Sequence, residues 1–142
     1  MNQHQSQVAE FHRALDIPIG DTPELRRKEL RFGVISEEYV ELGEALEADD
    51  LVEAIDALCD LLYVIYGAAV EWGIDLEPFF QEVHRTNMNK VGGPTRADGK
   101  KLKPEGWQPP NIAGILRQQI TEAQPGKYDS IIGRSASAAL GG

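Results

Sequence analysis

One stretch of the chain constrains the fold more than any other, a long apolar segment that carries three carboxylates. It reads EAIDALCDLLYVIYGAAV over residues 53–70. Glu53, Asp56 and Asp60 stand at positions i, i+3 and i+7, so an α-helix places them on one face. Asp60 has apolar neighbours on both sides, and such a carboxylate is costly to bury unless a cation or strong hydrogen bonds compensate it. The stretch therefore predicts a bundle helix that holds acids for a cation.

A matching set of acids precedes this stretch, in the sequence EEYVE over residues 37–41. Glu38 and Glu41 flank the apolar stripe of their own predicted helix, which places them along a seam between two helices. Taken singly, Glu37 and Glu41 fit a solvated acidic face better than a binding site. Two helices that each direct acids across a bundle nevertheless form a site for a hard divalent cation.

The acids of the apolar helix differ in how well a structural role explains them. Asp50 and Glu53 have the spacing of a capping box, so the backbone and a metal ion are alternative partners for Glu53. Asp56 and Asp60 stand one turn apart, which lets two carboxylates share one ion or bracket two. With no suitably spaced histidine or cysteine, the set favours Mg²⁺ or Mn²⁺ over zinc. So many acids indicate several ions around a phosphate chain, which would activate water and neutralise the leaving group.

Composition narrows the classes of partner. The chain has 142 residues, which suit a single domain, and a net charge of −9. This charge argues against nucleic-acid binding, which needs a basic footprint. Cys59, the single cysteine, fits a small hydrophobic role in a reducing compartment. The N-terminus lacks the order of a signal peptide and the apolar run 57–70 is too short to span a bilayer, so we expect a soluble, cytoplasmic protein without membrane contact.

Periodicity and capping signals predict an all-α protein. A first helix is expected over residues 3–15. Thr22 and Pro23 are typical of an N-cap and a first helical position, so a second helix is expected from there to about Ala48. Asp49 and the next residue supply a turn and the N-cap of a third helix.

The third helix is expected over residues 51–72, with Gly73 at its C-terminal end. Its apolar stripe is expected to pack inside the bundle and consists of Leu51, Ile55, Leu58, Leu62, Ile65 and Ala69. Asp75 is suited to cap a fourth helix that ends near Asn89, and a short helix is expected near residues 112–120.

These elements predict an antiparallel helical bundle of about four main helices, in which the second and third form a hairpin. We expect one domain over residues 1–120 and a flexible tail over 121–142. Between the fourth helix and the last lies a loop, residues 90–110, rich in glycine, proline and basic residues. It is interpreted either as a lid that closes over phosphates or as a basic surface connector.

The two acidic motifs resemble those of a known superfamily. The EEYVE motif, followed by DALCDLLY over residues 56–63, resembles the all-α nucleoside triphosphate pyrophosphatases, which include MazG proteins, dimeric dUTPases and phosphoribosyl-ATP pyrophosphohydrolases. The segments 60–67, 82–90 and 96–107 are similar to the MazG-like, dUTPase-like branch described from Deinococcus. The resemblance covers about residues 8–116.

The resemblance implies hydrolysis of a (deoxy)nucleoside triphosphate to the monophosphate and pyrophosphate, as in clean-up of dUTP or another non-standard nucleotide. It assigns catalysis to Glu37 and Glu38. The metal ligands that we expect from the motifs and their spacing are Glu38, Glu41, Glu53, Asp56 and Asp60. The residues that the resemblance matches to substrate contacts are Tyr63, Asn87, Lys90, Arg96, Lys100 and Lys103.

The second motif of the superfamily, ExxD, departs from the pattern here. Anchored on the following Leu-Leu-Tyr, its aspartate is Asp60 and its glutamate position is occupied by Ala57. The pattern also occurs one turn earlier, at Glu53 and Asp56. We therefore expect Asp56 to supply the missing carboxylate from the adjacent turn.

The apolar surface of these helices exceeds what one small hairpin covers, so we expect a homodimer or a larger homo-oligomer. Two alternatives to the proposed activity remain open. One is an enzyme like the phosphoribosyl-ATP pyrophosphohydrolases. The other is a non-catalytic helical interaction protein that uses its acids to dock a basic target.

Overall fold

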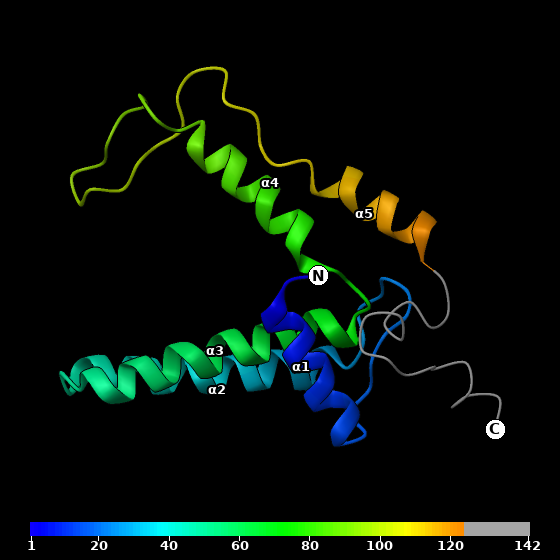
Figure 1. Ribbon diagram of the computed structural model, residues 1–142. Coiled ribbons are helices and arrows are strands. Elements are labelled where there is room, and N and C mark those ends of the chain that lie inside the picture. The colour runs from blue at the N-terminus through cyan, green and yellow to red at the C-terminus, as the bar shows by residue number, and fades with distance from the viewer. Residues whose placement is uncertain (124–142) are drawn as a thin grey trace.

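The computed structural model describes residues 1–123, and these form five α-helices without a strand (Figure 1). The helices are α1 (Gln3–Ala14), α2 (Lys28–Glu47), α3 (Leu51–Glu71), α4 (Leu76–Met88) and α5 (Ile112–Glu122). The predicted all-α class is confirmed. In the described part of the chain, no helix is long and apolar enough to cross a membrane.

The long antiparallel hairpin of α2 and α3 is the centre of the fold, and α1 packs across the C-terminal half of α3 (Figure 1). The turn of this hairpin agrees with the prediction. Asp49 adopts a left-handed conformation with φ of 53°, and the side chain of Asp50 accepts a hydrogen bond from the Glu53 amide. Alanines at the seam, Ala45 on α2 and Ala57 on α3, are buried. Such small side chains let two helices approach closely.

The beginning of α2 corrects a prediction. Thr22 and Pro23 do not start a helix; α2 begins at Lys28, after Arg27 in a left-handed conformation with φ of 44°. The preceding segment instead lies against the end of α3, where the Gly20 amide donates to the Val70 carbonyl at 3.0 Å. The Glu24 amide, which a Thr22 cap would bind, instead donates to the Trp72 carbonyl at 3.0 Å. The local capping signal is overridden because this tertiary contact satisfies the same backbone group.

The burial of α3 corrects a second prediction. Of the stripe expected inside the bundle, Ala69 is buried, whereas Ile55 and Leu62 are 53% and 56% exposed. Cys59 is exposed as well. Within one chain the hairpin is a single layer of two helices, covered by α1 at one end (Figure 1). The other face of α3 therefore has no partner in the described residues.

Helices α4 and α5 form an arm that extends away from the hairpin (Figure 1). The predicted cap of α4 is confirmed, since the Asp75 side chain accepts from the Glu77 amide at 3.1 Å. Gln119 of α5 fixes the base of the arm by accepting from the Asp75 amide at 3.1 Å and donating to its carbonyl at 2.8 Å. Helix α5 runs two residues beyond the predicted domain end. The rest of the predicted tail, residues 124–142, lies outside the described residues.

Candidate metal centre

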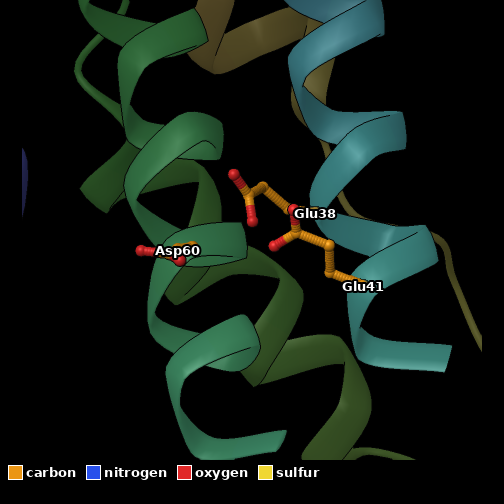
Figure 2. A group of neighbouring side chains, drawn as sticks. All are labelled: Glu38, Glu41 and Asp60. Carbon is orange, nitrogen blue, oxygen red and sulfur yellow. The ribbon is translucent and has the colours of Figure 1, made fainter. Parts of the chain in front are cut away.

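Three carboxylates meet across the hairpin at its middle. Glu38 and Glu41 project from α2, and Asp60 projects from α3 (Figure 2). Each offers one oxygen such that all three oxygens lie within 4.8 Å of one another. Positions i and i+3 put the two glutamates on one helix face, and the antiparallel register sets Asp60 opposite them. This is the seam arrangement that the sequence predicted for these three acids.

The electrostatics of Glu38 indicate that a partner is required. Its Oε2 is the one buried side-chain polar atom within residues 1–123 that has no hydrogen-bond partner. Burial raises the pKa of the Glu38 carboxyl, and the negative charges of Glu41 and Asp60 raise it further. A carboxylate without a partner is costly in these surroundings, and a divalent cation would relieve both the desolvation and the repulsion. The donor set therefore fits a metal ion.

An acidic pocket of about 430 Å³ adjoins the cluster toward the turn of the hairpin. Glu41 belongs to both the cluster and the pocket. The other acids that line the pocket are Glu44, Asp50, Glu53 and Asp56. The structure thus places two further predicted ligands, Glu53 and Asp56, beside the three clustered acids rather than among them. Glu37 is exposed and belongs to neither set.

The role of Glu53 becomes more specific in the structure. Its backbone N–H donates to the Asp50 side chain at 3.1 Å, as a capping box requires. The reciprocal bond is not formed, because the Asp50 amide donates to the Ala45 carbonyl at 3.0 Å. The Glu53 carboxylate is therefore not needed by the helix cap and lines the acidic pocket.

The residues expected to contact substrate divide between two places. Tyr63 lies on α3, one turn from Asp60, and lines a second pocket near α1. The others lie at the end of α4 or in the loop that follows, and this loop stands away from the hairpin of α2 and α3 that carries the acids (Figure 1). They are Asn87, Lys90, Arg96, Lys100 and Lys103. Within one chain, these residues are not brought to the three clustered acids.

The basic loop is ordered by its own contacts and by a hydrogen bond to α4, in which Nε1 of Trp107 donates to the Thr86 carbonyl at 2.7 Å. Thr95 and Lys101 form an isolated antiparallel bridge, and Arg96 forms an ion pair with Asp98. The Lys103 ammonium lies over the ring of Trp107, 4.7 Å from the ring centroid, in a cation–π contact. The predicted lid is therefore a small turn in this structure, and its closure over a substrate stays a prediction.

Comparison with known proteins identifies the family. Residues 8–87, more than half of the chain, match the phosphoribosyl-ATP pyrophosphohydrolase family. The chain belongs to this family. The match begins in α1 and ends in α4, so it includes the three clustered acids and excludes the basic loop. Because the family is part of the MazG-like all-α pyrophosphatase superfamily, the predicted superfamily resemblance is confirmed.

A viral protein shows a shorter similarity. An uncharacterized protein of Acanthamoeba polyphaga mimivirus is 44% identical over 48 residues. These residues are 34% of this chain and 19% of the viral protein, so the matched part spans about a fifth of that relative.

This family member also contains a buried charge cluster that no local sequence pattern predicts. Glu71, at the end of α3, is fully buried and forms ion pairs with Arg27 and Arg31. Burial pushes the pKa of the Glu71 carboxyl up, but the hydrogen bond from Arg27 and the charge of Arg31 outweigh it, and the pKa lies below its ordinary value. The sequence does show an acid at the end of an apolar helix, which indicates a buried charge. It does not indicate the partners, because neither arginine is near Glu71 in the sequence.

Proposed function

We propose that this phosphoribosyl-ATP pyrophosphohydrolase family member is a divalent-metal-dependent nucleoside triphosphate pyrophosphohydrolase. Water would add to the α-phosphorus of the substrate as the bond to the bridging α–β oxygen breaks, which yields the nucleoside monophosphate, pyrophosphate and a proton. The observation that carries this proposal is the group of Glu38, Glu41 and Asp60, in which one buried oxygen lacks a partner. Membership in a family of pyrophosphohydrolases supports it.

The metal in this proposal is Mg²⁺ or Mn²⁺, since the available donors are carboxylate oxygens. Glu38, Glu41 and Asp60 would hold it, and Asp56 and Glu53 extend the donor set into the adjoining pocket. When bound, such an ion supplies Lewis-acid polarisation of the phosphate oxygens and offsets charge on the leaving pyrophosphate.

The protein's own residues have two further tasks in this proposal. Glu37 and Glu38 would receive the proton of the attacking water. The raised pKa of the Glu38 carboxyl makes it a stronger base than an ordinary glutamate, although a bound cation would oppose this effect. The exposed position of Glu37 leaves it accessible to water.

The distance between the acids and the basic loop supports a homo-oligomeric enzyme. The arm stands away from the hairpin that carries the acids (Figure 1). Helix α3 also exposes Leu58 and Leu62. We propose a dimer, or a larger homo-oligomer, in which this apolar face is covered and the loop of one copy approaches the acids of another. Lys90 and Arg96 would then bind the substrate phosphates.

The substrate proposed first is a non-standard or deoxynucleotide such as dUTP, which makes the enzyme a cytoplasmic nucleotide-pool hydrolase of the dUTPase-like branch. The family match favours a second candidate, phosphoribosyl-ATP, whose hydrolysis breaks the same type of bond. The exposed basic loop does not distinguish between these two candidate substrates.

The test is a panel of ribo- and deoxynucleoside triphosphates and phosphoribosyl-ATP, each incubated with Mg²⁺ and assayed for pyrophosphate. We expect pyrophosphate and the monophosphate in equal amounts, with no orthophosphate. Chelation by EDTA should stop the reaction and added Mg²⁺ should restore it. Release of orthophosphate would contradict cleavage at the α–β bond, and no turnover of any compound would favour the non-catalytic interaction protein.

A further inference from the structure

A second pocket lies on the hairpin one helical turn from the acid cluster, with a volume of about 320 Å³. Val34 precedes Glu38 by four residues on α2, Val64 follows Asp60 by four residues on α3, and both valines line the pocket. Residues four apart share a helix face, so the pocket and the acids lie along one seam. The volume is at the lower end of the range for small-molecule sites, about 300–1,000 Å³.

The walls of this pocket suit a flat ring. Phe11 of α1 and Tyr63 of α3 both line it, with ring centroids 5.5 Å apart and planes at 81°. Leu30 adds a further apolar wall from α2. Arg31 and Gly67, which also line the pocket, each lie about 10 Å along their helix from Glu38 and Asp60 respectively, since seven residues at the α-helical rise separate each pair. This is the order of the span from the α-phosphate of a nucleotide to the far edge of its base.

Two polar groups meet at one point of the pocket. A Cβ atom at Gly67 would lie 2.8 Å from Nη1 of Arg31 and 3.3 Å from Nε2 of His12, so glycine is required for both to approach. The Nε of Arg31 donates to Glu71, whereas neither Nη atom has a hydrogen-bond acceptor among residues 1–123. The Nη atoms of Arg31 remain accessible to solvent. Among residues 1–123, the side-chain polar atom that is both buried and without a hydrogen-bond partner is Oε2 of Glu38, not an atom of Arg31.

The hydrogen bond made by Nδ1 of His12 determines whether the other ring nitrogen, Nε2, donates or accepts. Nδ1 lies 3.1 Å from the carbonyl oxygen of Pro18, so Nδ1 must carry the proton and donate. Burial lowers the pKa of the imidazole, and the nearby charge of Arg31 lowers it too, which favours the neutral ring. Nε2 is then an acceptor. The pocket therefore presents the arginine donors beside a histidine acceptor.

We propose that this pocket binds the base of a nucleotide whose phosphates lie at the acid cluster, and that Arg31 and His12 select bases with a carbonyl next to a ring N–H. This inference rests on the proposed function. Arg31 donates to the carbonyl oxygen, and the base N–H donates to Nε2 of His12. Uracil, thymine, guanine and hypoxanthine have this edge.

Cytosine and adenine present the reverse edge, with an amino donor beside a ring nitrogen acceptor. Binding either one sets donor against donor at Arg31 and acceptor against acceptor at His12. A bound base would cover these groups, and groups that lose water without gaining a partner carry a large penalty. Sites built for hydrogen bonding therefore discriminate more strongly than apolar ones. The expected preference for the carbonyl base is therefore about tenfold or more.

The experiment uses matched pairs that differ at one exocyclic group. Binding of dUMP and dCMP to the full chain is measured by calorimetry, and kcat/KM is measured for dUTP against dCTP and for dITP against dATP. We expect the carbonyl member of each pair to be favoured in both measurements. Arg31→Lys keeps a positive charge near Glu71 but removes the guanidinium fork, so it should reduce the preference to about threefold or less.

Arg26→Lys is the matched control, because Arg26 donates to the Glu71 carbonyl and does not line the pocket. It should leave the base preference unchanged. Equal dissociation constants for dUMP and dCMP in the wild-type protein would overturn the inference, even if Arg31→Lys fails to fold. So would an unchanged preference in an Arg31→Lys variant with native thermal unfolding.

The outcomes separate this inference from the proposed function. Pyrophosphate release from dUTP and dCTP with equal kcat/KM would retain the enzyme and overturn the selective pocket. Tighter binding of dUMP, without pyrophosphate from any nucleotide, would retain the pocket and overturn the hydrolase.

Discussion

Arg31 and Glu71 form an ion pair in which the two side chains are 8% and 0% exposed. The residues are 40 positions apart, and their contact joins the first turns of α2 to the end of α3. Arg27 binds the same carboxylate from the residue before α2. This cluster fixes the N-terminal end of the helix that carries Glu38 and Glu41, so it supports the geometry of the acid cluster from a distance.

Glu71→Gln should destabilise the protein by about 3–5 kcal/mol, because it leaves the buried Arg31 without its counter-charge. Urea unfolding followed by circular dichroism measures the change. Glu105→Gln is the control, since Glu105 is exposed and lies in the loop. A loss below about 1 kcal/mol would show that the cluster contributes little to stability.

His12 should make stability depend on pH. The pKa of its imidazole is lowered in the folded protein, mainly by burial and also by Arg31 and Arg27, against opposing effects of Pro18 and Glu71. The unfolded chain therefore takes up the proton more readily. This contribution to stability is complete above the ordinary histidine pKa of 6.5 and is lost as the pH falls below it.

Urea unfolding at about pH 7.5 and about pH 5.5 measures the His12 effect. We expect a lower free energy of unfolding at the lower pH and a smaller difference in His12→Gln. Glu71, whose pKa is also lowered, loses its contribution at still lower pH, below the ordinary glutamate range. An identical pH profile in the wild type and the variant would contradict the assignment to His12.

Asp60→Asn and Glu38→Gln should each abolish turnover while the helices remain intact, since each removes a ligand charge at nearly constant shape. Without metal, both variants should unfold at a slightly higher temperature, because the crowded acids no longer repel one another. Mg²⁺ should raise the melting temperature of the wild type and not that of the variants. Glu47→Gln is the control, since Glu47 lies on α2 like Glu38 but outside the three clustered acids. More than a few per cent of activity in both Asp60→Asn and Glu38→Gln would exclude the metal site.

Glu53→Gln tests whether the adjoining pocket takes part. The Asp50 amide is already satisfied by the Ala45 carbonyl, so the change should leave stability nearly unaltered. If Glu53 is a metal ligand, the variant should turn over more slowly and should need a higher Mg²⁺ concentration for half-maximal activity. Full activity together with a small loss of stability would instead return Glu53 to a purely capping role.

The basic loop should become resistant to trypsin when Mg²⁺ and a non-hydrolysable nucleotide are both added, if it closes over phosphates. The open loop is held by weak contacts of its own, including the exposed pair of Arg96 and Asp98. Phosphates would compete for those cations. Lys90→Ala or Arg96→Ala should raise KM if the contact is equally strong in the ground and transition states, and lower kcat if it forms later. Equal cleavage with and without ligand would make the loop a surface connector.

The sequence predicted those features whose causes lie within a few residues. The turn at Asp49, the caps at Asp50 and Asp75 and the extents of α3 and α5 follow from local side-chain chemistry. The meeting of Glu38 and Asp60 followed from helical spacing once α2 and α3 were taken as a hairpin.

The remaining features depend on contacts between distant residues. Thr22 is a good N-cap by type, but the segment around it is bound by the end of α3, and no local pattern reports that competition. The pairing of Glu71 with Arg31 depends on the register of the hairpin. Leu62 is exposed because no described element covers that face of α3, and the periodicity of a single helix does not encode which elements cover it.

The short turn of the hairpin has a kinetic consequence. Two helices joined by so few residues can pair progressively from the turn outward, since each new contact closes a small additional loop. Glu38 and Asp60 lie 22 positions apart and meet half-way along that path. The early contacts near the turn form before the acids are brought together, so their repulsion is felt late. We therefore expect Mg²⁺ to slow unfolding more than it accelerates folding.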